Sequence, residues 1–269
     1  MPPKRPSGNV QYENHGRVVI VTGGSMGIGE AIAHAFAESG AHVYNADITS
    51  PTRPSDRGTS VVKHLPCDTA SESDCQAIVK HVLDEHGAVD VLINNAAIQP
   101  PESYQPIDRV DSQVWRRMID VNLCGYMRMA SEVLPQMKRQ ESGVIINLAS
   151  GQAHRTAREV GVYGPIKSAN VMQARQWGVE YARDGIRVLS VSPGAIDTPM
   201  VRASLAEQGG AAELGNRHPV GRIGTTDEVA AAVLWLSSPA ASFVTATDLE
   251  VDGGLGALGS FAAPYPMPE

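Results

Sequence analysis

Three side chains in this sequence have the types and spacing that proton transfer needs: Ser150, Tyr163 and Lys167. Tyr163 and Lys167 are four residues apart, which places them on one face if the segment is helical. A phenol has an ordinary pKa of about 10, and a lysine one helical turn away favours the phenolate through its positive charge. Ser150 follows an apolar run, Val144–Leu148, that is typical of a buried strand. The trio predicts an acid–base site in which the serine hydroxyl holds an oxygen that is oxidised or reduced.

A glycine-rich turn near the N-terminus predicts a dinucleotide site. An apolar run, Val18–Val21, leads into the turn, and apolar residues recur at helical spacing over 31–36. Gly23, Gly27 and Gly29 let the backbone of such a turn approach a pyrophosphate, whose charge then faces the free N–H groups of the helix N-terminus. The order of strand, glycine turn and helix makes this prediction more specific than the glycines alone.

Strand-like runs alternate with helical stretches along the whole chain. This alternation predicts an α/β fold of the Rossmann type, in three layers, with a seven-stranded parallel sheet between helices. A length of 269 residues fits one such domain. We expect an N-terminal arm over 1–15, the domain over 16–256 with a lid over 195–217, and a C-terminal tail over 257–269. The predicted strands lie at about 17–22, 41–47, 60–66, 90–94, 144–149, 187–192 and 247–251.

Composition excludes several classes of function. The formal net charge of −7 argues against a general nucleic-acid binder. No stretch reaches the roughly 18 apolar residues of a membrane span, and the N-terminus lacks the apolar core of a signal peptide. The three widely spaced cysteines and the histidines show no metal-ligand spacing. We therefore predict a soluble, cytoplasmic protein with reduced thiols and no metal, membrane or nucleic-acid partner.

In combination, these motifs resemble those of the short-chain dehydrogenase/reductase family from about Arg17 to Gly254. The sequence departs from the family at Ala97, where glycine is usual, and at Gly164 and Pro165 between the tyrosine and the lysine. The resemblance implies a nicotinamide-dependent oxidoreductase. The segments that carry it are Thr22–Gly29, Asn94–Ala97, Asn122, the trio Ser150, Tyr163 and Lys167, and Pro193–Gly194 with Thr198.

The resemblance also implies a role for each site residue. Tyr163 is the base, Lys167 lowers its pKa and holds the nicotinamide ribose, and Ser150 positions the substrate oxygen. The carbonyl of Asn122, in a bulge of a long helix over 112–137, positions a water that connects Lys167 to solvent. The implied cofactor contacts are Gly23, Ser25, Gly27, Ile28, Gly29, Asp47, Asp68, Asn95, Ala96, Tyr163, Lys167, Pro193, Ile196 and Thr198.

Asp47, at the end of the second predicted strand, indicates NAD as the cofactor. Its carboxylate can accept hydrogen bonds from the adenosine ribose and repel a 2′-phosphate, although an aspartate there could also cap a turn. Family members that prefer NADP often carry a basic residue at the places that Met26 and Ile48 occupy here. Arg53 and Arg57 lie further into the following loop, and we interpret them as solvated charges.

Two further positions bear on local geometry. Asp68 follows the third predicted strand and either hydrogen-bonds adenine, as the resemblance implies, or caps the next helix with Ser71 nearby. Pro165 is tolerated only in the first turn of a helix, so we expect that helix to begin between Gly161 and Gly164. Tyr163 and Lys167 then still share one face.

The loop between Ser150 and Tyr163 is strongly polar, which favours a hydrophilic substrate. A sugar or polyol needs several hydrogen-bond donors and acceptors, whereas a steroid or acyl pocket needs an apolar lining. The cations of this loop, including Arg158, could hold an acidic or sulfonated sugar, or could simply face solvent. The predicted substrate contacts are Gln99, Ser150, Gln152, His154, Arg155 and Tyr163.

The sequence as a whole predicts an enzyme that transfers a hydride between a secondary or anomeric alcohol of a hydrophilic sugar or polyol and NAD. One alternative is a ketone or 3-oxoacyl reductase, or a cyclic diol dehydrogenase. An alternative from another class is a cofactor-sensing protein that kept the fold without catalysis. The resemblance also implies a homo-oligomer, a dimer or tetramer, that pairs the helices over 112–137 and 163–183.

Overall fold

The computed structural model describes residues 10–51, 61–204 and 209–259. Within these ranges, seven parallel strands form one sheet in the order β3-β2-β1-β4-β5-β6-β7. This arrangement confirms the predicted fold class, and each strand lies within two residues of its predicted bounds. The strands are β1 (Val18–Thr22), β2 (His42–Asp47), β3 (Val62–Pro66), β4 (Val91–Asn94), β5 (Gly143–Leu148), β6 (Ile186–Pro193) and β7 (Asp248–Val251).

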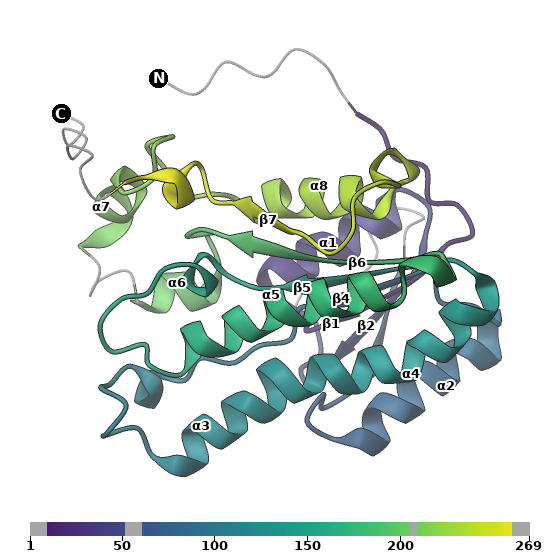
Figure 1. Cartoon of the computed structure of the whole chain (residues 1–269), viewed down its shortest axis with the longest axis horizontal. Helices are drawn as coiled ribbons and strands as arrows, with labels where there is room; N and C mark the ends of the chain where they lie inside the picture. Colours follow the sequence, from purple (N-terminus) through teal and green to yellow (C-terminus); the bar gives the residue numbers. More distant parts are fainter. Residues whose placement is uncertain (1–9, 52–60, 205–208, 260–269) are drawn as a thin grey trace.

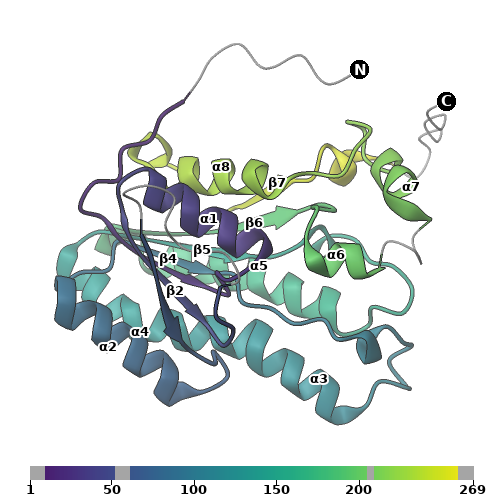
Figure 2. The same cartoon turned by 180° about the vertical axis from the view of Figure 1, so that it is seen from behind.

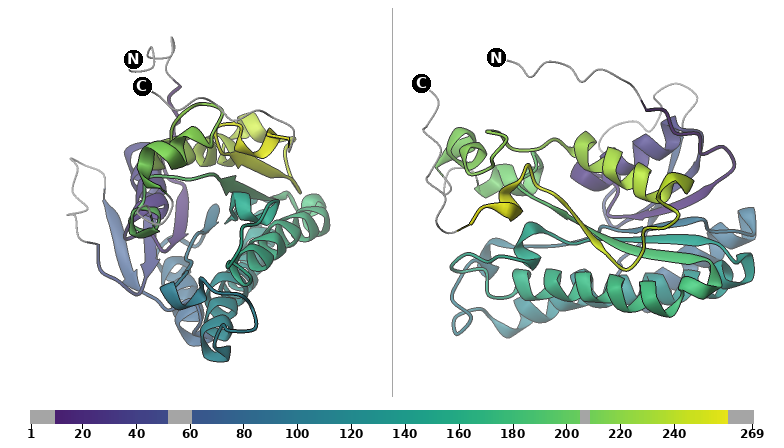
Figure 3. Two further views of the ribbon diagram at one scale, coloured as in Figure 1. Left: turned by 90° about the vertical axis from the view of Figure 1, so that its left-hand side faces the viewer. Right: turned by 45° about the horizontal axis from the view of Figure 1, so that its top comes forward.

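Helices cover both faces of the sheet, as Figures 1 and 2 show from opposite sides and Figure 3 shows end-on. One face packs against α1 (Gly27–Glu38) and α8 (Thr226–Ser237). The other face packs against α2 (Glu72–His86), α4 (Gly125–Gln140) and α5 (Tyr163–Glu180). Among the described residues, no helix is long and apolar enough to cross a membrane. Shorter helices are α3 (Ser112–Ile119), α6 (Pro199–Ser204) and α7 (Gly210–Asn216).

Burial of the strands explains their continuous apolar runs. All five residues of β1 are buried. Because neighbouring side chains of a strand point to opposite faces, Val19 and Val21 contact the layer of α1 and α8, while Val18 and Ile20 contact the layer of α2, α4 and α5. The sequence of a strand that is covered on both sides therefore shows no alternation of apolar and polar residues.

The sheet order creates the place where a ligand binds. The chain runs outward from β1 to β2 and β3, and then returns to add β4 on the other side of β1. Neighbouring connections therefore leave the carboxyl ends of β1 and β4 in opposite directions, which opens a crevice between them. The glycine turn follows β1 at this crevice.

The long helix predicted over 112–137 is interrupted by a π-helical turn, Asp120–Cys124, between α3 and α4. The bulge that the resemblance implied at Asn122 is therefore present. The Asn122 side chain is buried, and it both donates to and accepts from the backbone of Ile98 at 2.8 Å. These two hydrogen bonds fix the bulge to the segment that follows β4.

Helix α5 begins at Tyr163, so Pro165 is its third residue. The predicted start between 161 and 164 is confirmed, and the missing N–H of the proline lies in the first turn, where it breaks no intrahelical hydrogen bond. Tyr163 and Lys167 consequently lie one turn apart on the same helix.

Some predicted segments fall partly outside the described residues: 1–9 of the arm, 205–208 of the lid, 260–269 of the tail, and the loop with Arg53 and Arg57. The described part of the arm includes Asn14, which is buried and donates a hydrogen bond to Ser39 at 2.8 Å. The packed chain thus begins before residue 16.

Candidate active site

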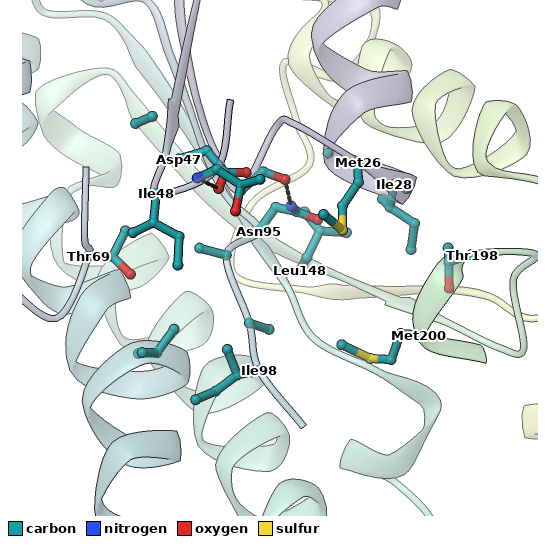
Figure 4. A pocket seen from close by; sticks show the side chains of 18 of the residues that line it. Met26, Ile28, Asp47, Ile48, Thr69, Asn95, Ile98, Leu148, Thr198 and Met200 are labelled. Carbon is teal, nitrogen blue, oxygen red and sulfur yellow. Dashed lines mark hydrogen bonds between the residues drawn. The ribbon is translucent and has the colours of Figure 1, made fainter. Parts of the chain in front are cut away.

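A cavity of about 330 Å³ lies at the carboxyl ends of the central strands, within the size range of small-molecule sites. In Figure 4, Asp47 and Ile48 lie towards one side of it, and Thr198 and Met200 towards the other. Most of the predicted cofactor contacts line it. They are Gly23, Gly27, Ile28, Gly29, Asp47, Asp68, Asn95, Ala96, Tyr163, Lys167, Pro193 and Thr198.

The glycine turn is held against β4 by Asn95. Its side-chain amide donates to the carbonyls of Thr22 and Gly23 at 3.0 and 2.9 Å, while the Thr22 hydroxyl accepts from the backbone of Asn95 and Ala96. Gly29 packs so closely that a Cβ atom there would overlap the Gly23 carbonyl and the Asn95 amide. This close packing of turn, strand and helix is what a dinucleotide site requires.

The N-terminus of α1 faces this turn with its first amides uncapped. Met26 is the N-cap residue, and it makes no side-chain capping bond. Helix N–H groups without a side-chain cap are a favourable site for phosphate oxygens. The donor set therefore fits the pyrophosphate of a nicotinamide cofactor, with Ile28 and Gly29 of the first helical turn lining the cavity.

Asn45 and Asp47 of β2 hold the other side of the turn. The Asn45 oxygen accepts from Gly24 N at 2.8 Å, and its amide donates to the Ser25 hydroxyl at 2.9 Å. The Asp47 carboxylate accepts from Ser25 N at 3.0 Å. Ser25 is buried, so it supports the turn and does not line the cavity. Sequence reasoning missed Asn45, whose signal is a polar residue inside an apolar strand run.

The surroundings of Asp47 bear on the choice between NAD and NADP. Met26 and Ile48, which line the cavity near it, are 48% and 66% exposed, so apolar side chains stand where a 2′-phosphate would need cations. Among the described residues, the cations in the lining are Arg117 and Lys167. Asp47 also accepts from Thr49 N at 2.9 Å, which supports the turn-capping interpretation beside the ribose one.

Asp68 forms an ion pair with Arg117 of α3 at 2.9 Å and accepts from Ala70 N at 2.9 Å. The interpretation of Asp68 as the N-cap of α2 is wrong, because Ser71 is the N-cap and accepts from Asp74 N. Asp68 is therefore placed at the cavity wall by a pairing that the sequence did not indicate. The pairing also neutralises Arg117, a cation in the lining.

The structure brings Ser150, Tyr163 and Lys167 together at the cavity. Ser150 follows β5, and its hydroxyl lies near enough to the Tyr163 side chain to favour the phenolate. The ammonium nitrogen of Lys167 lies 5.6 Å from the centre of the Tyr163 ring. Ser150 itself lies beside the cavity lining and accepts from Gln152 N at 3.2 Å. A serine, a phenol and an ammonium group in this order can hold and deprotonate an alcohol.

Burial acts against charge on both titrating groups. It raises the pKa of Tyr163 well above the ordinary value, with Tyr104 adding to the rise and the Ser150 hydroxyl opposing it. Burial lowers the pKa of Lys167 to about 7. The phenolate that catalysis needs therefore depends on the ammonium charge, which itself depends on hydrogen bonds. The Lys167 ammonium group donates a hydrogen bond to the Leu148 carbonyl at 2.7 Å and one to the Tyr126 hydroxyl at 3.2 Å.

Asn122 lies behind the cavity lining. Its carbonyl accepts from the side-chain amide of Asn170 at 3.0 Å. Asn170 is on α5, three residues after Lys167, so the bulge is tied to the helix that carries Tyr163 and Lys167. The role of the Asn122 carbonyl in holding a water stays a prediction. Ile196 also lies outside the lining, in the core beside β6.

Gln99, Gln152, His154 and Arg155, the other predicted substrate contacts, lie outside the lining of this cavity. Within the described residues, the amide oxygen of Gln152 is buried and has no hydrogen-bond partner. An acceptor of this kind, two residues from Ser150, suits a hydroxyl group of a substrate.

The cations of the loop after Ser150 contact the C-terminal part of the chain. His154 lies 2.7 Å from a carboxylate oxygen of Asp248 in β7. Arg155 donates to the carbonyl of Leu255 and lies 3.8 Å from Glu250. Neither side chain simply faces solvent, and an anionic substrate would have to compete with carboxylates already in place. The expectation of an anionic substrate thus gains no support from these two positions.

Comparisons with known proteins agree with this geometry. A family model described as enoyl-(acyl carrier protein) reductase matches residues 23–256. The chain is 36% identical to 2,5-dichloro-2,5-cyclohexadiene-1,4-diol dehydrogenase of Sphingobium indicum, over 90% of this chain and 98% of that one. It is 35% identical to cis-4-hydroxycyclohexanecarboxylate dehydrogenase of Sinomonas cyclohexanicum, over 88% and 96%. The ligand-free structure of Thermoplasma acidophilum aldohexose dehydrogenase superposes with a TM-score of 0.86 at 35% identity, over 94% and 98%.

Proposed function

Because this chain belongs to the short-chain dehydrogenase/reductase family, we propose that it uses NAD to oxidise a secondary or anomeric alcohol of a hydrophilic sugar or polyol. The observation that carries the proposal is the cluster of Ser150, Tyr163 and Lys167 at a cavity whose other end holds Asp47. The groups proposed for catalysis and those proposed for cofactor binding thus lie in one crevice, which supports hydride transfer between them.

Residues of this chain transfer the hydroxyl proton of the substrate. The Ser150 hydroxyl holds the substrate oxygen beside Tyr163, and the Tyr163 phenolate accepts the hydroxyl proton as the carbonyl forms. Lys167 stabilises that phenolate by its charge. Bound nicotinamide supplies the hydride acceptor for the carbinol carbon. Since Tyr163 must be ionised to act, kcat/KM for alcohol oxidation should fall as pH falls through its effective pKa.

Asp47 supports NAD over NADP. A carboxylate beside the ribose position repels a 2′-phosphate, and the apolar side chains of Met26 and Ile48 offer it no compensating charge. The carboxylate is also fixed in place by the amides of Ser25 and Thr49. A fixed charge discriminates more strongly than a mobile one, because it cannot turn away from the phosphate.

A substrate with several hydroxyl groups is supported by the buried, unpartnered amide oxygen of Gln152 among the described residues. One solved structure that this chain resembles is named an aldohexose dehydrogenase, and an aldohexose carries several hydroxyl groups. A second candidate is a less polar cyclic alcohol. Ile98 and Met200 line the cavity, and two curated relatives are named for cyclohexadiene and cyclohexane alcohols.

Initial rates with NAD and with NADP across aldoses, sugar acids, polyols and cyclic diols test the proposal. We expect NAD to be preferred by about tenfold or more in kcat/KM and a sugar or polyol to be the best substrate. A preference for NADP would refute the cofactor assignment. Faster oxidation of cyclic diols than of every sugar would establish the second candidate instead.

Self-association is a further part of the proposal. The helices α4 and α5, which the family resemblance pairs across a two-fold axis, expose apolar side chains: Met127 is 42%, Met172 58% and Val179 72% exposed. Burial of such side chains favours a homo-oligomer. Sedimentation that shows a monomer at micromolar concentration would contradict it.

A further inference from the structure

Tyr126, in the first turn of α4, lies directly against the catalytic lysine. Its hydroxyl oxygen is 3.2 Å from the ammonium nitrogen of Lys167, which lies 5.2 Å from the centre of the Tyr126 ring. Both nitrogen and hydroxyl also hydrogen-bond the Leu148 carbonyl, at 2.7 and 3.0 Å. Each of the two side chains is 1% exposed, so no bulk water replaces these contacts.

The hydrogen-bond directions make Tyr126 an acceptor towards the ammonium group. The Tyr126 hydroxyl gives its single proton to Leu148, so its lone pairs face Lys167. An ammonium group has three N–H donors, and Tyr126 and Leu148 take two of them. One donor is left for Tyr163 or for the cofactor ribose.

The surroundings of Lys167 offer little other support for its charge. Burial lowers the pKa of Lys167, and in the described part of the chain the titrating groups that act on this region are phenols: Tyr126, Tyr163 and, beyond it, Tyr104. The charge that activates Tyr163 therefore depends on neutral acceptors.

We propose that Tyr126 is a positioning residue that holds Lys167 as an ammonium ion, through its hydroxyl oxygen, and so keeps that charge beside Tyr163. The inference rests on the proposed function only for its kinetic readout. Loss of the hydroxyl should make the ammonium less stable, so that phenolate with ammonium becomes a smaller share of the singly deprotonated pair, and the plateau of kcat/KM for alcohol oxidation should fall.

Tyr126→Phe removes the hydroxyl and keeps the ring. In NAD-free protein with ¹³C-labelled lysine, the Cε signal of Lys167, assigned by its loss in Lys167→Met, should titrate about one pH unit lower than in wild type. The plateau of kcat/KM should fall by up to about tenfold, the fold-change that corresponds to one pH unit in the Lys167 titration. Tyr126→Leu also lacks the hydroxyl and should lower the Lys167 titration by at least as much. An unchanged Lys167 titration in folded Tyr126→Phe would overturn the proposal.

Tyr44→Phe is the matched control. Tyr44 is also fully buried and donates to a charged group, Glu85 at 2.7 Å, but it lies outside the cavity lining. Its loss should lower stability and leave both the Lys167 titration and the plateau of kcat/KM in place; a Lys167 shift equal to that of Tyr126→Phe would overturn the proposal.

A measurement on wild type remains if the variants do not fold. The Cζ signal of Tyr126 should change at the pH where Lys167 titrates, and a flat signal would overturn the proposal. Absence of turnover with every alcohol would instead count against the proposed function, because both titrations need no substrate.

Discussion

The two halves of the crevice are held by different kinds of contact. In the cofactor half, amide side chains and backbone groups join the turn after β1 to its neighbours, as when Asn95 and Asn45 bind the turn at 2.8 to 3.0 Å. In the substrate half, polar side chains join the loop after Ser150 to carboxylates of β7, as His154 and Arg155 do. The first set consists mainly of close-packed hydrogen bonds to backbone groups, whereas the second joins partly exposed side chains to carboxylates.

This difference separates a rigid part of the site from an adjustable one. A close-packed turn loses its shape if one atom is added, because protein interiors leave no room. Ion pairs with partial exposure contribute roughly 0 to 1 kcal/mol each, so they guide a loop without fixing it firmly. One fold can therefore keep its cofactor and vary its substrate, as the different names of the relatives suggest.

The largest effect should come from the chemistry that the two halves share. Tyr163→Phe removes the proton acceptor and keeps the ring, so kcat should fall by about 10²-fold or more. The NAD Kd should stay within about twofold, because the glycine turn and the N-terminus of α1, which we propose bind the pyrophosphate, are unchanged. Steady-state kinetics and calorimetric titration of NAD measure both, and near-normal turnover would refute the assigned base.

Gly29→Ala tests the rigidity of the cofactor half. The added Cβ would overlap the Gly23 carbonyl, so the turn must shift and the NAD Kd should rise by about tenfold or more. Gly87→Ala is the control: it strains a residue with φ of +67° at the end of α2, but a Cβ there meets no atom within 4 Å. If both variants bind NAD equally well, the glycine turn is less rigid than its packing indicates.

Asp47→Ala should raise the ratio of NADP to NAD use in kcat/KM by about tenfold, because it removes a repulsive charge. Asp47→Asn separates charge from size, since it keeps the side-chain volume and loses the carboxylate. Repulsion predicts that both variants gain NADP activity. A gain only in Asp47→Ala would show instead that the side chain excludes the phosphate by its bulk.

The rigid half was also the more predictable from sequence. The apolar run of β1, the glycine turn and Pro165 in the first turn of α5 act locally, so their patterns indicate the structure directly. Asn95 was predicted through its motif, while Asn45 was missed because its partner is set only when β1 and β2 pair. Local patterns left Asp68 ambiguous as well, since only the fold shows that Ser71 caps α2.

Contacts between distant segments could not be predicted. Nothing near Tyr126 in the sequence indicates that its hydroxyl reaches Lys167, 41 residues later. The partners of His154 and Arg155 lie about 100 residues further along, at 248 to 255. The sequence suggested that these two side chains bind an anionic substrate, because the carboxylates of β7 come near them only in the folded chain.

The smallest effect should come from the substrate half, where Arg155→Ala tests whether the arginine restrains the loop or binds the substrate. As a restraint, Arg155 acts on every substrate alike, so its loss should raise KM by about threefold for neutral and anionic substrates and change kcat little. As a substrate anchor, it would affect only anionic ones. Arg158→Ala, in an exposed residue of the same loop, is the control for lost charge. A rise in KM confined to anionic substrates would show that Arg155 leaves β7 to bind them, and the adjustable half would then be a charge-selective one.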